Sequence, residues 1–195
     1  MTEFNLQAYW SNEMESHADC ASKTAQTLQP EFTKLLKTCV EAIKNNKKIL
    51  FFGNGGSAAD AQHLATELTV RFVENRAPIA AIALTTDTST ITAAGNDIGF
   101  ENIFARQIDA IGQDGDVAIA ISTSGKSPNI INALKMANKK NISTIGFSGR
   151  DGGAMPALCD HMLIVPSETT SRIQEMHILL GHMLCGGLEQ QLGLV

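Results

Sequence analysis

The chain has 195 residues, of which 44% are hydrophobic and 18% charged, and its formal net charge is −5. This length suits one globular domain with a sizeable core, and the hydrophobic content excludes a disordered chain. The charged fraction is below the roughly 25% typical of globular chains, which indicates extensive burial, as in an oligomer. An acidic balance argues against binding to a nucleic-acid backbone, and no apolar run reaches the ~18–20 residues of a membrane span.

The N-terminus has neither the basic start nor the apolar stretch of a signal peptide. The four cysteines lie far apart and form no CxxC pair; they are Cys20, Cys39, Cys159 and Cys185. In a chain of this length without an export signal, such cysteines are typical of reduced core thiols. We therefore expect a cytoplasmic protein with no membrane contact.

The first 46 residues have a helical pattern. Residues 1–28 carry a loose version of it, and Pro30 begins a second segment with one apolar stripe. The stripe consists of Phe32, Leu35, Leu36, Cys39, Val40 and Ile43. We predict a helical arm over residues 1–46 that packs in an oligomer, followed by an α/β domain over residues 47–195.

Five short apolar runs follow, separated mostly by helical stretches: Lys48–Phe52, Ile79–Leu84, Val117–Ile121, Ile142–Phe147 and Met162–Val165. Uniformly apolar runs are typical of strands covered on both faces, and their alternation with helices predicts a doubly wound parallel sheet. The last 25 residues predict one helix that is apolar nearly all round. Such a helix must be covered on most sides, by its own domain or by another subunit.

Two loops rich in small residues follow the first and third predicted strands, at Gly53–Ser57 and Ser122–Ser127. Glycine lets a backbone approach a ligand closely, and N–H groups at a helix start attract anions. The hydroxyls of the second loop are neutral donors suited to a phosphate monoester. If the two strands flank the point where strand order reverses, both loops face one crevice.

Each loop also has another interpretation. The first is compatible with a simple tight turn, and it fits a dinucleotide fingerprint at Gly53, Gly55 and Ala58, with Asp87 as the ribose ligand. That acid lies 34 residues beyond Gly53, whereas about 20 are typical, so the match is weak. The second loop ends like a P-loop, but Ala120 stands where the first glycine is needed. A serine-rich phosphate cradle is therefore favoured over nucleotide hydrolysis.

His63 and Glu67 are four residues apart on the helix after the first loop, so both side chains lie on one face. That pair suits two metal ligands, or a carboxylate base beside a polar neighbour. A solvated helix face is the plainer alternative. The pair follows directly from the glycine loop, which favours a place in the same crevice.

Polar residues also interrupt the apolar C-terminal helix. Gln174 and His182 are eight residues apart, roughly 12 Å along a straight helix. Both residues can bind one compact ion only if long side chains converge, if the helix is irregular near Gly181, or if two subunits contribute to the site. For His177, a buried histidine with satisfied hydrogen bonds is favoured over a functional one.

In order and spacing, these motifs resemble the bacterial phosphoheptose isomerases, the sedoheptulose-7-phosphate isomerases of the sugar isomerase (SIS) superfamily. The motifs are Gly53–Ser57, His63-x-x-x-Glu67, Asn96-Asp97, Ser122-Thr123-Ser124 with Ser127, and Arg172-Ile173-Gln174-Glu175 followed by His182. The resemblance implies a flavodoxin-like five-stranded SIS sheet and a cytoplasmic homotetramer with active sites between subunits. It implies conversion of sedoheptulose 7-phosphate to D-glycero-D-manno-heptose 7-phosphate through an enediol, the first step towards the ADP-heptose of lipopolysaccharide core.

The resemblance also implies the roles of individual residues. Glu67 would be the general base and His182 the general acid. The phosphate would be held by Ser122, Thr123, Ser124 and Ser127. The sugar would be contacted by Asn54, Gly55, Gly56, Ser57, Glu67, Asn96, Asp97 and Gln174. One zinc ion per subunit would be bound by His63, Glu67, Gln174 and His182.

A second interpretation assigns the chain to another functional class, that of non-catalytic binding proteins. The same superfamily includes a replication-initiator-associating protein, a tetrameric binding module without isomerase chemistry, which residues 85–87 and 171–177 also resemble. That relative lacks counterparts of Glu67 and His182, and both are present in this chain. We therefore predict the isomerase, ahead of the binding module and of a nicotinamide-dependent dehydrogenase.

Overall fold

The computed structural model describes residues 4–195, and its five strands form one sheet in the order β2-β1-β3-β4-β5. The strands are β1 (Ile49–Gly53), β2 (Ala81–Ala83), β3 (Val117–Ile121), β4 (Ser143–Gly149) and β5 (His161–Val165). Every neighbouring pair is parallel. The predicted doubly wound, flavodoxin-like sheet is confirmed, and all five predicted strands are present.

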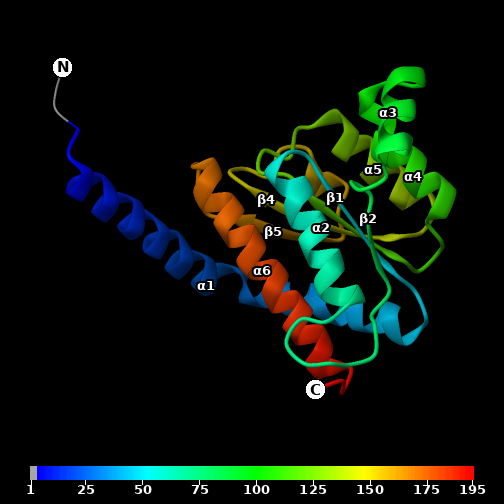
Figure 1. Ribbon diagram of the computed structural model, residues 1–195, viewed down its shortest axis with the longest axis horizontal. Helices are drawn as coiled ribbons and strands as arrows, with labels where there is room; N and C mark the ends of the chain where they lie inside the picture. Colours follow the sequence, from blue (N-terminus) through cyan, green and yellow to red (C-terminus); the bar gives the residue numbers. More distant parts are fainter. Residues whose placement is uncertain (1–3) are drawn as a thin grey trace.

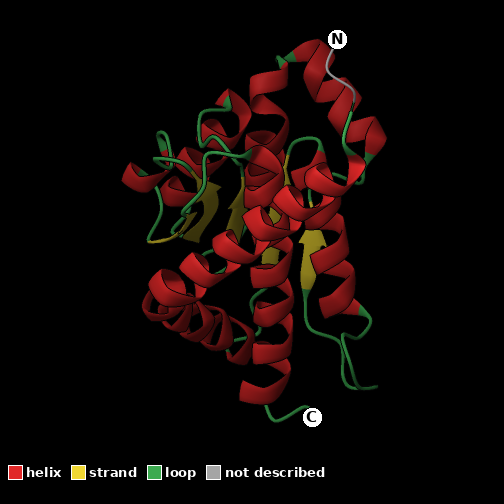
Figure 2. Ribbon diagram, turned by 90° about the vertical axis from the view of Figure 1, so that its left-hand side faces the viewer, coloured by secondary structure: helices red, strands yellow, loops and turns green. Residues whose placement is uncertain are grey.

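Six α-helices are found in the described part of the chain: α1 (Leu6–Lys44), α2 (Gly56–Thr69), α3 (Thr88–Asp97), α4 (Ile103–Ile111), α5 (Pro128–Lys139) and α6 (Thr170–Gln191). A short 3₁₀ turn, η1 (Phe100–Asn102), lies between α3 and α4, and a second, η2 (Met155–Ala157), lies between β4 and β5. Helices α1, α2 and α6 pack on one face of the sheet, and α3, α4 and α5 on the other (Figure 1). The strands consequently lie at the centre of the molecule, behind helices in Figure 2.

The apolar runs form strands because both faces of the sheet are covered. In β1, Ile49 and Phe51 pack towards α1, α2 and α6, whereas Leu50 and Phe52 pack towards the opposite helices. All four side chains have no exposed surface. A strand in this position needs apolar residues on both faces, and alternation with polar residues would bury unpaired polar groups.

Helix α1 contradicts the predicted division at Pro30, because it continues through the proline without a break. A proline inside a helix costs about 3 kcal/mol, since it removes one hydrogen bond and crowds the preceding turn. Buried residues on both sides of it, Thr24 before and Leu35 and Cys39 after, fix the helix by packing. Tertiary contacts with α6 and β5 offset the local cost.

The first turns of α1 project from the α/β body (Figure 1), whereas Glu13 already contacts Arg172 of α6 and Cys20 is buried. The predicted arm over residues 1–46 and domain over residues 47–195 remain a prediction, and residues 1–3 lie outside the described part. In residues 4–195, no helix has the length and apolar character needed to cross a membrane.

The predicted C-terminal helix is observed as α6, uninterrupted from Thr170 to Gln191. One of its faces is uncovered within the chain, where Leu179 and Met183 are 43% and 48% exposed. All four cysteines are free thiols. Burial raises the pKa of Cys39 and Cys185 to about 12, so these thiols are protonated and unreactive at neutral pH.

Candidate functional site

The site is built where the order of the strands reverses. Strands β1 and β3 are neighbours, with Gly53 opposite Ile121 at their carboxyl ends. From these ends the chain turns into α2 on one face of the sheet and towards α5 on the other. The two loops part at this edge, which is where ligands bind in open parallel sheets.

The glycine loop is shaped by its lack of side chains. A Cβ atom at Gly53 would lie 2.7 Å from the Cβ of Ser57 and 2.8 Å from the carbonyl oxygen of Ile121. Gly55 has φ of +56° at the N-cap of α2, a conformation that favours glycine. A Cβ atom at Gly56 would meet the amide of Gln174. The start of α2 therefore presents bare backbone, with Ser57 buried behind it.

The serine loop is held by hydrogen bonds within the loop and to β4. The hydroxyl of Ser122 accepts from the Gly125 N–H at 3.2 Å, and that of Ser124 accepts from the Lys126 N–H at 3.3 Å. Ser148 on β4 donates to the Ser122 carbonyl at 2.8 Å. Because both loop hydroxyls use oxygen lone pairs in these bonds, their O–H groups remain to donate to a ligand.

A pair of amides joins the two loops. Asn54 and Asn129 donate to each other's side-chain oxygens, both at 2.9 Å. Asn129 lies in the first turn of α5, and its residue surface is only 2% exposed. In the sequence, only its position in the first turn after the serine loop marks Asn129 as a candidate. Its neighbours in the sequence do not indicate that it pairs with Asn54, 75 residues away.

The contact between α2 and α6 brings three candidate residues together. Gly181 lies directly against Leu64, so that a side chain there would collide with it. The close approach places the Nε2 atoms of His63 and His182 2.8 Å apart, and His63 Nε2 lies 3.4 Å from Glu67 Oε1. A carboxylate and two imidazoles thus meet about two to three turns along α2 from the glycine loop. His182 also stacks on Phe72, with ring centroids 5.5 Å apart.

The predicted zinc ligands are brought together only in part. His63, Glu67 and His182 offer the nitrogen and oxygen donors that zinc accepts. Gln174 instead lies beside Gly56, and because α6 is regular through Gly181, an irregular helix is ruled out as a way to join it to His182. Among residues 4–195, no group of three or more His, Cys, Asp and Glu side chains is arranged to hold a metal. The donor chemistry fits zinc, but one chain does not assemble all four ligands.

Asn96 and Asp97 lie at the exposed end of α3. The amide of Asn96 donates to Asp97 at 2.7 Å. No hydrogen bond joins either to another candidate residue in the part of the chain that the structure describes. Their predicted contact with the sugar therefore stays a prediction.

Two polar residues of α6, His177 and Arg172, make structural contacts rather than contacts with the two loops. His177 is fully buried, one ring nitrogen lies 3.0 Å from the Ser148 carbonyl, and burial lowers its pKa to about 4. The other nitrogen, Nδ1, has no partner among the described residues. Arg172 links α6 to α1 through Glu13 at 3.1 Å and also binds Glu175 at 2.6 Å. Neither residue faces the two loops through a polar contact.

Comparison with known proteins identifies the family. The SIS domain matches residues 14–149. A phosphoheptose isomerase of Paramagnetospirillum magneticum is 53% identical over 93% of this chain and 94% of its own length. The chain belongs to the phosphoheptose isomerase family. The structure of a family member from Neisseria gonorrhoeae has a TM-score of 0.91 at 41% identity, covering 95% of this chain and all of the other. A second, from Francisella tularensis, has a TM-score of 0.93 at 37% identity, covering 96% of this chain and all of the other.

Membership of the phosphoheptose isomerases disfavours both other readings. The curated and structural relatives are named as isomerases rather than as replication-associated binding proteins. Asp87, the acid that a nicotinamide cofactor would need, caps α3 by accepting from the backbone N–H of Thr90 at 3.0 Å. That bond, with a second from the Thr90 hydroxyl, lowers the pKa of the Asp87 carboxyl. Its role is that of a helix N-cap.

Proposed function

We propose that the protein is a cytoplasmic enzyme that converts sedoheptulose 7-phosphate to D-glycero-D-manno-heptose 7-phosphate, the entry to ADP-heptose synthesis for lipopolysaccharide core. Two findings support this reaction: the relationship to proteins named phosphoheptose isomerase, and the meeting of Glu67 and His182 at His63. The second carries the chemistry, because a ketose–aldose exchange needs a base and an acid side by side.

In the proposed mechanism, Glu67 removes a proton from C1 of the ketose while His182 donates one to the carbonyl oxygen at C2. The product is an enediol, which carries hydroxyls on both carbons. Return of the proton to C2 and loss of the proton on the C1 oxygen give the aldose, so atoms balance without an external reagent. A carboxylate and an imidazole can carry out such transfers near neutral pH.

The phosphate is proposed to bind at the serine loop. Hydroxyls of Ser122 and Ser124 are oriented by backbone N–H groups, and α5 begins immediately beyond Ser127. Neutral donors together with a helix N-terminus suit a dianion. Asn54 and the bare backbone of Gly55 and Gly56 would then face the sugar from the other side of the crevice.

Zinc is proposed as the cofactor, held by His63, Glu67 and His182, with Gln174 as the fourth ligand. When bound, zinc polarises a carbonyl oxygen. A carboxylate that binds zinc tightly is a poor free base, so Glu67 has two competing roles. Removal of metal by a chelator therefore decides between metal-assisted and purely acid–base chemistry: metal-assisted turnover falls on chelation and returns with added Zn²⁺.

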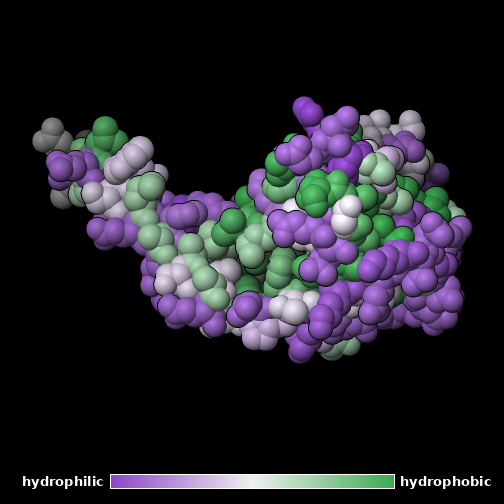
Figure 3. All heavy atoms as spheres, turned by 90° about the horizontal axis from the view of Figure 1, so that it is seen from below, coloured by the Kyte–Doolittle hydropathy of each residue, from purple (hydrophilic) through white to green (hydrophobic). Residues whose placement is uncertain are grey.

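The protein is further proposed to be a homotetramer with shared active sites. An apolar groove of about 200 Å³ lies between α1 and α6, with Leu28, Phe32, Leu179 and Met183 in its walls. The projecting first turns of α1 expose further apolar residues, among them Tyr9, Trp10 and Met14. Figure 3 shows hydrophobic side chains in the angle between this arm and the body. A second copy of the chain would cover both surfaces.

The decisive experiment measures conversion of sedoheptulose 7-phosphate to the aldoheptose phosphate by purified protein, with and without a chelator. Turnover establishes the reaction. Its absence from folded, metal-supplemented protein would overturn the proposal and favour the binding-module reading.

A further inference from the structure

A buried ion pair lies behind the proposed catalytic residues. Arg76 is in the segment that follows α2, and Glu189 is in the last turns of α6. The Arg76 Nε atom lies 2.8 Å from Glu189 Oε1, and each side chain is only 1% exposed. Buried charges of this kind are costly unless each is paired and fully hydrogen-bonded. The other hydrogen bonds of Arg76 and Glu189 therefore indicate which parts of the fold this ion pair holds in place.

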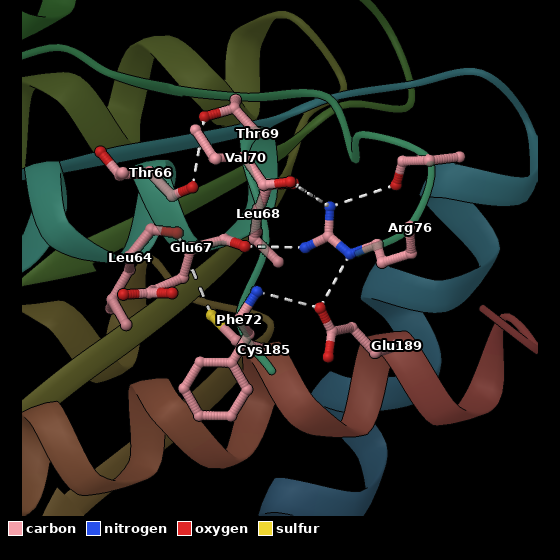
Figure 4. A network of polar contacts seen from close by, with 11 residues as sticks. Leu64, Thr66, Glu67, Leu68, Thr69, Val70, Phe72, Arg76, Cys185 and Glu189 are labelled. Atoms are coloured by element: carbon pink, nitrogen blue, oxygen red, sulfur yellow. Dashed lines mark hydrogen bonds and ion pairs between the residues drawn. The ribbon is translucent and has the colours of Figure 1, made fainter. Parts of the chain in front are cut away.

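Other N–H groups of Arg76 bind the end of α2 (Figure 4). Its Nη2 donates to the Glu67 carbonyl and its Nη1 to the Leu68 carbonyl, both at 2.7 Å. The last carbonyls of a helix have no partner within the helix, and a cation there is favourable. No basic residue lies in the last turn of α2 itself. Arg76 therefore supplies this charge from outside the helix and binds the backbone of Glu67 directly.

Glu189 also links this ion pair to His182. Its Oε1 atom also accepts from the backbone N–H of Phe72 at 3.1 Å. The ring of Phe72 stacks on that of His182, with centroids 5.5 Å apart and an interplanar angle of 29°. One carboxylate oxygen thus holds both the guanidinium behind Glu67 and the residue that packs against His182.

We propose that Arg76 and Glu189 are positioning residues of the isomerase site: Arg76 sets the backbone of Glu67, and Glu189 sets the ring of His182 through Phe72. The inference rests on the proposed roles of Glu67 and His182. Neither member of the pair touches the substrate. Their effect is to keep a base and an acid in register, and small displacements of catalytic groups reduce the rate of chemistry strongly.

Three variants test this. Arg76→Lys keeps the charge but lacks the planar fork that reaches Glu189 and both carbonyls at once. Glu189→Gln keeps the shape of the side chain but removes its charge. Phe72→Leu removes the stacked ring and leaves the ion pair in place. We expect each to lower kcat about 10-fold to 100-fold while KM changes by about twofold at most, because the chemistry and not the binding is disturbed.

A matched control is the ion pair of Lys48 and Asp116, at the opposite, amino ends of β1 and β3. Its atoms Nζ and Oδ2 lie 2.6 Å apart, and Asp116 is also buried. Lys48→Gln breaks this pair and should lower the melting temperature while leaving kcat unchanged. If Arg76→Lys and Phe72→Leu keep kcat within about twofold of wild type, or lose no more than Lys48→Gln does, the pair only stabilises the fold and the proposal is wrong.

A spectroscopic measurement separates this inference from the proposed reaction. An aromatic ring stacked on an imidazole shifts the resonances of the ring protons, and the His182 signal is assigned by its loss in His182→Gln. We expect Phe72→Leu, Arg76→Lys and Glu189→Gln each to move that signal, and Lys48→Gln not to. An unmoved signal in Arg76→Lys and Glu189→Gln overturns the positioning role even if the wild-type protein is active. A moved signal supports it even if the protein fails to turn over the heptose phosphate.

Discussion

His63 and His182 are 119 residues apart in the sequence, yet their Nε2 atoms lie within hydrogen-bond distance, at 2.8 Å. Such a bond needs one nitrogen to carry a proton and the other to be bare, so at least one of the two rings is neutral. With the Glu67 carboxylate 3.4 Å from the same His63 nitrogen, the cluster can accept and donate protons in one place. This is the arrangement that proton transfer between adjacent carbons requires.

The first prediction concerns this cluster. Glu67→Gln removes the base and His182→Ala removes the acid, and we expect each to lower kcat by about 10²–10⁴-fold in a folded, assembled protein. Steady-state turnover of sedoheptulose 7-phosphate measures the effect. The matched control is His161→Gln, since His161 binds Glu31 and Thr38 at the edge of the sheet. Near-normal turnover by either site variant would refute the assigned roles.

The second prediction tests whether active sites are shared. Gln174 and His182 lie on one regular helix, about 12 Å apart along its axis, so one site contains both only if long side chains converge or two chains contribute. If Gln174 and His182 reach one site from two chains, mixing inactive Gln174→Ala subunits with inactive His182→Ala subunits should restore part of the activity. Mixing Glu67→Gln with His182→Ala subunits should restore none, because these two residues meet at His63 within one chain. The mixed assemblies are verified by native mass spectrometry before assay. If the mixture of Gln174→Ala and His182→Ala subunits remains inactive, the site does not take Gln174 and His182 from two chains.

The third prediction concerns the amide pair between the loops. Asn129→Asp keeps the size of the side chain but cannot donate to Asn54, whose side-chain oxygen loses its partner. Leaving one buried polar group unpaired costs about 1–3 kcal/mol, and we expect kcat/KM to fall about tenfold, mainly through KM. Asn132→Asp is the control, because Asn132 lies one turn further along α5 and donates to the Glu101 carbonyl instead. An unchanged KM in Asn129→Asp would show that the pair does not orient Asn54.

The sheet could be predicted because strands buried on both faces are apolar at nearly every position. Val117–Ile121 is apolar at every position and forms β3 with the predicted bounds. The edge strand β2 is shorter than its predicted run, and its Ile82 is 39% exposed. Local pattern failed at Pro30, where packing on both sides overrides the cost of the proline.

The site was predictable only where its residues belong to recognisable motifs. The glycine loop and the His63–Glu67 pair have local spacing that identifies them. Asn129, Arg76 and Glu189 do not, because their meaning depends on partners far along the chain. A charged residue in a sequence is expected to be solvated, and no local pattern distinguishes the buried Arg76 from an exposed arginine.

The last prediction is a dependence of stability on pH that arises from His177. Burial lowers its pKa in the folded protein to about 4, from the ordinary value of 6.5. Between these two pH values the unfolded chain binds more protons than the folded one, so the free energy of unfolding falls as pH decreases from about 6.5 to about 4. The shift corresponds to a loss on the order of 3 kcal/mol per chain.

His177→Gln isolates this contribution, since glutamine can still donate to the Ser148 carbonyl but does not titrate. Denaturant unfolding at fixed protein concentration, measured at intervals over this pH range, should show a shallower pH dependence for the variant than for the wild-type protein. The two proteins should run parallel above pH ~6.5, where the histidine is neutral in both the folded and the unfolded state. If the two curves stay parallel down to pH ~4, His177 is protonated at its ordinary pH in the folded protein, and its burial is not what sets the acid stability.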